Sequence, residues 1–246
     1  NKDKDYEWML KHQFGEVTFT DVSEQYAQLA LQGPKALDIL KKLTAEENIP
    51  EKNYYAVFGA EVAGIPCIVS RTGYTGEDGV ELYLDSCNAE KMWDVLLENG
   101  KEEGLIPCGL GARDTLRMEA AMPLYGHEMD DETSPLETGL KFAVKMKKDD
   151  FIGKKALEEQ GEPKRTRVGL KVTGRGIIRE HQDVYFNGEK IGCNTSGTHC
   201  PYLGYPIAMA LVVSGSVELG ATVQVEVRGR QVEAEVVALP FYKRNK

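Results

Sequence analysis

Residues 65–84 read IPCIVSRTGYTGEDGVELYL, and this stretch decides the first part of the fold. It contains two β-rich runs, at 65–70 and 80–84, which are joined by a connection with three glycines. A third β-rich run, at 55–62, precedes them and is separated from the first by Ala63-Gly64. The pattern predicts three antiparallel strands.

The flanking sequence adds helices and two further strands. Gly33-Pro34 forms a turn that can open a helix, because proline is tolerated in a first helical turn. Asn88 can cap another helix that ends near Gly100. In total we expect helices over 4–12, from 34 onward, 88–100 and 112–121, and additional strands over 17–20 and 26–31.

The composition changes after Met122. Residues 123–164 have no sustained helix or strand period and are interpreted as a connector. From 165 onward, short β-rich runs alternate with Gly or Asn-Gly turns such as Asn187-Gly188, which predicts a small all-β module. Its expected strands lie at 168–172, 184–186, 207–213, 222–227 and 232–239, so the predicted domains are 1–122, 123–164 and 165–246.

The overall composition excludes several classes of protein. With 41% hydrophobic and 28% charged residues in 246, the chain resembles ordinary soluble proteins. A net charge of −9 disfavours nucleic acid as a partner, and no apolar run approaches the ~20 residues that span a bilayer. Five cysteines without a Cys-x-x-Cys motif suit reduced thiols in the cytoplasm.

Charge is distributed unevenly along the chain. Residues 165–246 carry 11 Lys/Arg against 7 Asp/Glu, a balance of +4, which leaves −13 for the rest. A mildly basic module could meet an acidic partner. The alternative is that this uneven distribution of surface charge has no function.

Two segments contain residues suited to ligand binding. In 70–81, three glycines allow close approach to a flat ligand, Tyr74 could stack on it, and a carboxylate could pair with its N–H groups. The alternative is a β-hairpin with no ligand. In 109–119, glycines precede a helix on which Arg113 could reach into a cavity, while Arg117 is better explained as a surface residue near acids.

Metal and nucleophilic chemistry have little support. The four histidines are scattered without zinc-ligand spacing. His199 and Cys200 are adjacent, but adjacent residues of a strand point to opposite faces. No metal site is expected, and no catalytic residue can be assigned from sequence.

Long motifs resemble the aminomethyltransferases, the T-protein family of the glycine cleavage system. The matching segments span nearly the whole chain: RTGYTGEDGVE (71–81), GLGARDTLRMEAAMPLYGHE (109–128), SPLETGL (134–140), DFIGKKAL (150–157), GRGIIRE (174–180) and TSGTHCPYLGYPIAMALV (195–212). The resemblance implies an α+β fold, with mixed and antiparallel sheet lobes and helices around a folate cavity plus a C-terminal β-barrel. It also implies transfer of a methylene from an aminomethyl group on the lipoyl arm of the H-protein to tetrahydrofolate, with release of ammonia.

Family roles carry over onto matching residues. Glu81 matches the glutamate at the pterin and Arg113 the arginine there, where a carboxylate suits the pterin N–H donors and a guanidinium its 4-oxo group. Tyr74, with Tyr54 or Tyr55, would line the walls of the ring, unless these are ordinary core aromatics. Arg179 matches an arginine that faces the lipoyl arm and the acidic H-protein.

Three departures from the family qualify these roles. The family's front portion, with an aspartate that aligns the folate, has no counterpart here, so the chain alone is expected to be weakly active or inactive. The usual Gly-Ile-Pro-Arg has Ile178 in place of proline, and the usual lysine after Gly204 is Tyr205. The alternatives are a folate-binding or partner-docking module without turnover and a related folate-dependent demethylase.

Overall fold

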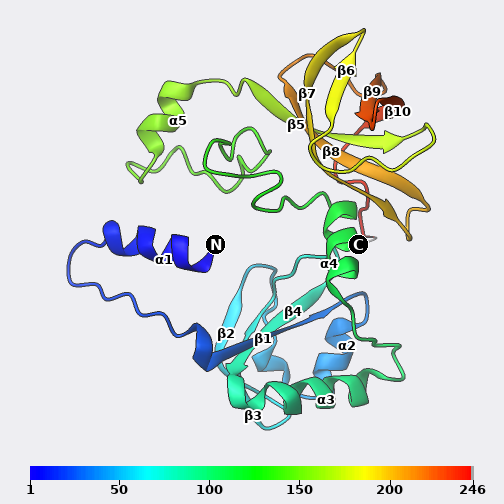
Figure 1. Cartoon of the computed structure of the whole chain (residues 1–246). Coiled ribbons are helices and arrows are strands. Elements are labelled where there is room, and N and C mark those ends of the chain that lie inside the picture. Colours follow the sequence, from blue (N-terminus) through cyan, green and yellow to red (C-terminus); the bar gives the residue numbers. More distant parts are fainter. Residues whose placement is uncertain (245–246) are drawn as a thin grey trace. The chain divides into compact units, whose positions relative to one another are not determined.

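The computed structural model describes residues 1–244, which divide into two compact units (Figure 1). The first unit comprises residues 1–73 and 78–107. The second comprises residues 74–77 and the chain from 108 onward. Four residues of the glycine-rich connection therefore belong to the second unit, while the strands on either side of it belong to the first.

The first unit is built on a four-stranded antiparallel sheet in the order β1-β4-β3-β2. The pairing of β2 with β3 has an irregular register between Val57 and Ala60 of β2, where Gly59 adopts a φ of 69°. The three antiparallel strands expected from residues 55–84 are confirmed. The strands are β1 (Tyr26–Gln32), β2 (Ala56–Val62), β3 (Ile65–Ser70) and β4 (Gly79–Asp85).

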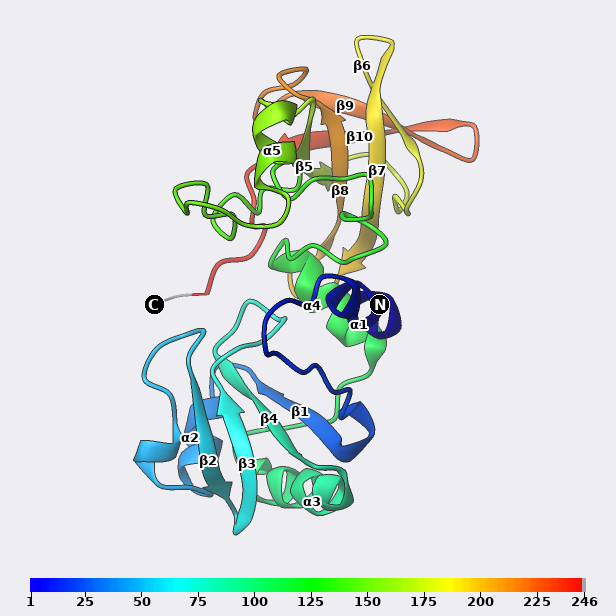
Figure 2. The ribbon, with the colours of Figure 1, turned by 90° about the vertical axis from the view of Figure 1, so that its left-hand side faces the viewer.

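Two helices cover one face of this sheet (Figures 1 and 2). Leu40 of α2 and Met92 of α3 are fully buried against Leu82 and Leu84 of β4, and burial of this apolar surface stabilises the unit. The side chains of β4 alternate between this core and the opposite face. The helices are α1 (Lys2–Lys11), α2 (Ala36–Lys41) and α3 (Ala89–Gly100), with short 3₁₀ turns at Ser23–Gln25, Glu46–Asn48 and Ser86–Asn88.

The second unit contains a closed six-stranded barrel in the order β10-β5-β8-β7-β6-β9 (Figure 2). Valine, leucine, isoleucine and alanine side chains fill its interior, including Leu170, Val184 and Val223. The elements are α4 (Leu110–Glu119), α5 (Lys154–Gln160), β5 (Arg165–Val172), β6 (Asp183–Phe186), β7 (Glu189–Cys200), β8 (Tyr205–Val213), β9 (Thr222–Val227) and β10 (Arg230–Val237). The expected α+β fold with a C-terminal barrel is confirmed.

The Asn-Gly turn predicted in this module is also confirmed. Asn187 and Gly188 both have positive φ, at 52° and 83°, and connect β6 to β7. Two consecutive positive φ angles are typical of the hairpin turn that Asn-Gly favours.

Two predictions about individual strands were wrong. Residues 17–20 were expected to form a strand but adopt irregular structure, because no described strand pairs with them. The longest barrel strand, β7, was missed because its Gly, Asn, Ser and Thr residues have a weak strand pattern. Its glycines are required by packing, since a Cβ at Gly192 would lie 2.1 Å from the carbonyl oxygen of Leu211.

Candidate functional site

Glu81 lies on the face of the first sheet that the helices do not cover. It alternates along β4 with the buried Val80 and Leu82, so its side chain points away from the core. Ala30 of β1 and Ser70 of β3 are its direct neighbours across the sheet. Both of these flanking side chains are small.

Neutral donors hold the Glu81 carboxylate. The amide Nε2 of Gln28 donates to its Oε1 at 2.8 Å, and the hydroxyl of Thr72 donates to its Oε2. The hydroxyl of Tyr83 lies 3.4 Å from Oε2, and burial raises the pKa of Tyr83. A carboxylate has about four lone-pair positions, so it can accept further hydrogen bonds from a ligand.

Arg71 fixes the segment that carries two of the predicted aromatic residues. Its guanidinium donates to Asp78 Oδ2 at 2.8 Å and to the carbonyl of Glu51 at 2.8 Å. Its backbone is hydrogen-bonded to Tyr54 and Tyr55. Both rings are solvent-exposed, by 83% and 62%, so they are not core aromatics.

Tyr74 and Arg113 lie together in the second unit. The Arg113 guanidinium carbon is 4.5 Å from the centre of the Tyr74 ring, within cation–π distance. The Tyr74 hydroxyl donates to the carbonyl of Pro123 at 2.7 Å. Burial raises the pKa of Tyr74, so this phenol remains a donor at neutral pH. Sequence reasoning proposed both residues for one site but did not predict their mutual contact.

A glycine allows residues 74–77 to pack closely against α4. Gly76 has a φ of 77°, and a Cβ there would lie 2.7 Å from the Cβ of Ala120. The next residue, Glu77, accepts a hydrogen bond from the Tyr242 hydroxyl, which raises the pKa of Tyr242 to about 12. These contacts fix the connection within the second unit.

Arg117 is buried, contrary to its interpretation as a surface residue. It is 1% exposed, and its guanidinium donates to Glu128 at 2.9 Å, Asp114 at 2.8 Å and Ser196 at 3.0 Å. Glu128 is fully buried and also accepts a hydrogen bond from Thr195 at 2.6 Å. This network joins α4 to strand β7 of the barrel.

A second buried acid, Glu119, lies at the end of α4. Burial raises the pKa of its carboxyl, and within residues 1–244 its Oε1 has no hydrogen-bond partner. The pKa of the neighbouring Cys200 is raised to about 12, mainly by burial and secondly by the Glu119 carboxylate. The Cys200 thiol is therefore protonated at neutral pH and is not a nucleophile.

Glu119→Gln is expected to flatten the pH dependence of stability. Because burial raises the pKa of Glu119 above its ordinary value of 4.5, the folded chain holds a proton that the unfolded chain releases. The contribution of this group to the free energy of unfolding therefore falls as the pH rises from 4.5 toward the raised pKa of the folded chain. Urea titrations between pH 4 and 8 should show the variant gaining stability over the parent chain as pH increases. An identical slope in both chains would contradict the prediction.

Arg179 lies on a loop that the barrel holds in place. The preceding Ile178 is fully buried among barrel residues, so an apolar anchor stands where the family usually has proline. The buried Asn194 donates from its amide to the carbonyl of Arg179 and accepts from the backbone N–H of Gln182 at 2.8 Å. The Arg179 guanidinium itself is exposed and lies 3.4 Å from the carbonyl of Gly197.

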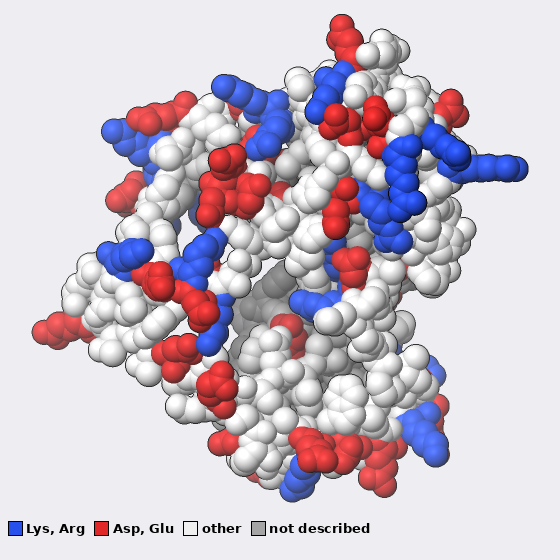
Figure 3. Space-filling model, viewed as in Figure 1, with Lys and Arg blue, Asp and Glu red and all other residues white. Residues whose placement is uncertain are grey.

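On the face seen in Figure 3, the second unit carries charges of both signs. Figure 3 shows Lys and Arg interspersed with Asp and Glu over the barrel and the α5 segment. Tyr205, which replaces the usual family lysine, lies under Lys171, whose Nζ is 4.7 Å from the ring centre. The Lys171 ammonium group therefore lies next to residue 205, although residue 205 is not itself basic.

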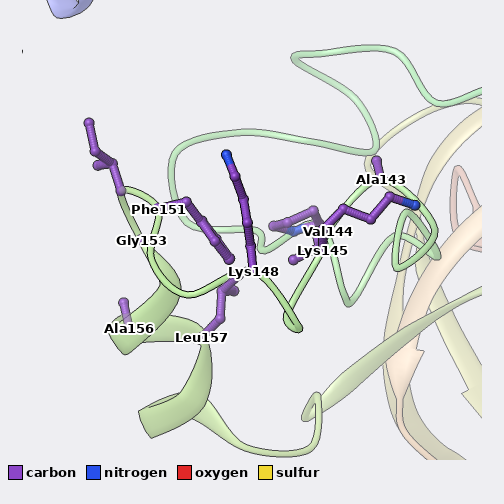
Figure 4. A pocket seen from close by; sticks show the side chains of 10 residues that line it. Ala143, Val144, Lys145, Lys148, Phe151, Gly153, Ala156 and Leu157 are labelled. Atoms are coloured by element: carbon purple, nitrogen blue, oxygen red, sulfur yellow. The ribbon is translucent and has the colours of Figure 1, made fainter.

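A groove of about 560 Å³ lies elsewhere in the second unit, beside α5 (Figure 4). Its walls carry two lysines and otherwise apolar or small side chains, with no carboxylate, hydroxyl or imidazole. They are formed by Pro135, Ala143, Val144, Lys145, Lys148, Phe151, Ile152, Gly153, Ala156 and Leu157. None of the predicted site residues lines this groove.

The structure thus assembles two sets of candidate residues. Glu81, Tyr54 and Tyr55 belong to the first unit, and Tyr74, Arg113 and Arg179 to the second. That Glu81 and Arg113 bind one ligand stays a prediction. Within residues 1–244, no group of three or more His, Cys, Asp or Glu side chains could hold a metal ion, and no helix is long and apolar enough to cross a membrane. Sequence reasoning missed the three donors to Glu81, which are Gln28, Thr72 and Tyr83.

Comparison with known families identifies two matching domains. Residues 1–148 match the family described as the GCVT N-terminal domain. Residues 165–243 match the glycine cleavage T-protein C-terminal barrel domain. The second match covers the closed barrel.

Individual relatives agree with these domains. The chain is 51% identical over 247 residues to an aminomethyltransferase of Halalkalibacterium halodurans, covering 99% of this chain and 67% of the relative. It is 50% identical over 250 residues to an aminomethyltransferase of Bacillus cereus, covering 100% and 68%. The crystal structure of glycine cleavage system aminomethyltransferase T from Bartonella henselae superimposes with a TM-score of 0.82 at 32% identity, covering 99% and 66%. The chain spans about two thirds of the length of these relatives.

Proposed function

Since this chain belongs to the glycine cleavage T-protein family of aminomethyltransferases, we propose that it transfers the one-carbon unit of an aminomethyl group to tetrahydrofolate. The aminomethyl group would be carried on the lipoyl arm of an H-protein. Its carbon would form bonds to two folate nitrogens in place of its bonds to the amine and to the lipoyl sulfur. The amine would leave as ammonia and the sulfur as a thiol, and these two groups would take up the protons that the folate nitrogens lose.

The observation that carries this proposal is the Glu81 carboxylate, held by neutral donors on the sheet face opposite α2 and α3. A pterin presents a 2-amino group and a ring N–H side by side, and a carboxylate can accept from both. Arg113 supplies the complementary group, because its N–H donors suit the 4-oxo oxygen of the pterin. The exposed rings of Tyr54 and Tyr55, and that of Tyr74, are proposed as aromatic contacts of the same ligand.

Arg179 is proposed to meet the H-protein and its lipoyl arm. Its exposed guanidinium on an anchored loop supports this role, because a fixed cation loses little conformational freedom when it binds an acidic partner. A cytosolic location is part of the proposal. The five cysteines support it, since none of them forms a disulfide within residues 1–244.

The proposed ligand can be tested by titration calorimetry with tetrahydrofolate. Glu81→Ala and Arg113→Ala should each weaken binding by about tenfold to a hundredfold, because hydrogen bonds to charged groups contribute about 1.5–3 kcal/mol. The matched controls are Glu61→Ala, an exposed acid of the same sheet, and Arg175→Ala, an exposed arginine of the second unit. Unchanged affinity in both site variants would remove the assignment of this ligand site.

Turnover separates this function from folate binding or partner docking without chemistry. An H-protein loaded with the aminomethyl group is mixed with the chain and tetrahydrofolate, and released ammonia is measured. Ammonia formed at any rate above that without the chain, however slow, supports the transferase. Folate binding without ammonia release would favour the docking module, whereas transfer of an intact methyl group from dimethylsulfoniopropionate to tetrahydrofolate, with release of the thioether, would favour a demethylase.

A further inference from the structure

The contact between Tyr74 and Arg113 suggests a role for the tyrosine beyond that of an aromatic wall. The guanidinium covers a face of the Tyr74 ring at 4.5 Å from its centre. The opposite end of the tyrosine is fixed, because its hydroxyl donates to the carbonyl of Pro123 at 2.7 Å. The ring is therefore held at its backbone and at its hydroxyl, and it provides a stable support for the cation.

Arg113 has few other restraints on its side chain. It is exposed, and within residues 1–244 no group accepts a hydrogen bond from its guanidinium. A cation–π contact engages the flat face of the guanidinium and leaves the N–H groups at its edge available. The ring thus restricts where the cation lies without consuming the donors that would bind a ligand.

The backbone beneath Arg113 is also fixed. Arg117 follows one helical turn later. Its hydrogen bond to Ser196 of β7 holds α4 against the barrel, and its ion pair with the buried Glu128 fixes the guanidinium. The remaining freedom of Arg113 therefore lies in its own side-chain torsions. Those are the torsions that contact with Tyr74 restricts.

We propose that Tyr74 is a positioning residue that aims the Arg113 guanidinium at the 4-oxo group of a pterin, so that the site selects 4-oxo over 4-amino pteridines. This inference rests on the proposed folate-dependent function. A 4-oxo group accepts hydrogen bonds from the guanidinium edge, whereas a 4-amino group is itself a donor. A guanidinium has no acceptor to offer, so the amino analogue would leave donors facing donors.

The selectivity is tested by comparing dissociation constants for tetrahydrofolate and its 4-amino analogue. The parent chain should favour the 4-oxo ligand by about tenfold or more, the effect of one hydrogen bond to a charged group. Tyr74→Leu should reduce this ratio to within about threefold, because the cation loses its support. Tyr74→Phe keeps the ring face and should retain most of the ratio.

Two further variants separate positioning from general damage. Arg113→Met removes the hydrogen-bond donors and keeps a side chain of similar length, so the ratio should collapse although Tyr74 is intact. Tyr205→Leu removes a comparable cation–π contact, that of Lys171 at 4.7 Å, and should leave the ratio unchanged. A Tyr74→Leu chain that keeps the parent ratio would overturn the inference.

A ligand-free measurement distinguishes failure of this inference from failure of the proposed function. The NMR order parameter of the Arg113 Nε–H group should fall in Tyr74→Leu and stay at the parent value in Tyr205→Leu. An unchanged order parameter in Tyr74→Leu would overturn the positioning role. A parent chain that binds neither pteridine would instead overturn the proposed function and the selectivity, while a falling order parameter would still support the positioning of Arg113.

Discussion

Replacing Arg117 by methionine is expected to lower the free energy of unfolding by about 3–5 kcal/mol, the loss typical of breaking a buried ion pair. The substitution would leave the fully buried Glu128 carboxylate without its cation. It would also remove the donor to Ser196 on β7. Methionine has a similar length and no charge, so the loss should come from unpaired polar groups more than from an empty cavity.

Urea denaturation followed by circular dichroism measures this loss. Arg175→Met serves as the control, since Arg175 is exposed and its replacement should change stability by less than about 0.5 kcal/mol. The double variant Arg117→Met with Glu128→Leu should recover much of the stability, because the buried carboxylate that would lack its cation is also removed. A loss below about 1 kcal/mol in Arg117→Met would show that the network is not energetically important.

Asn194→Ala is expected to lower the free energy of unfolding by about 2–4 kcal/mol, because both side-chain hydrogen bonds of a buried residue are lost together. The asparagine amide donates to the carbonyl of Arg179, and its oxygen accepts from the N–H of Gln182. Alanine offers neither group. The loop that carries Arg179 should therefore open more often than the barrel to which it is attached.

Hydrogen exchange followed by mass spectrometry would localise this effect. Residues 175–182 should lose protection in Asn194→Ala, while peptides from β9 and β10 keep theirs. Asn194→Asp keeps an acceptor for Gln182 but places oxygen against the Arg179 carbonyl, so it should loosen the loop as well. Thr222→Ala, on the exposed surface of β9, is the control. Parent-like protection of 175–182 in both Asn194 variants would show that the loop is held by other contacts.

The same variant separates the two proposed binding functions. If Arg179 meets the H-protein, Asn194→Ala should raise the KM for the loaded H-protein and leave the affinity for tetrahydrofolate unchanged. A general loss of folding would weaken both. A raised KM for the H-protein with an unchanged affinity for tetrahydrofolate would therefore assign the effect to the Arg179 loop.

Local sequence patterns were sufficient for most strands but not for their arrangement. The runs at 65–70 and 222–227 were predicted with the bounds that the structure has. The four-residue run at 17–20 had the right alternation but acquires no pairing partner, and pairing is a property of the whole fold. Strand β7 shows the reverse case, since its glycines weaken the local pattern yet allow close approach to β8.

Some residues of the candidate site could be found from local sequence, and others could not. Glu81 and Arg113 were identified from motifs, because their roles attach to recognisable local sequence. Gln28 could not be found in this manner, since its contact with Glu81 depends on β1 pairing with β4 across more than fifty positions. Arg117 was assigned to the surface because sequence spacing does not reveal a partner such as Ser196, which lies on a strand of the barrel.

The outer strands of the first sheet have a consequence for self-association. A closed barrel has no unpaired edge, but within residues 1–244 β1 and β2 each have a strand partner on one side only. The irregularity at Gly59 interrupts β2, whereas β1, with the sequence YAQLALQ, is regular, uncharged and free of proline. Such segments are typical templates for cross-β stacking, so fibrils of a partly opened chain would be nucleated at β1 and not from the barrel.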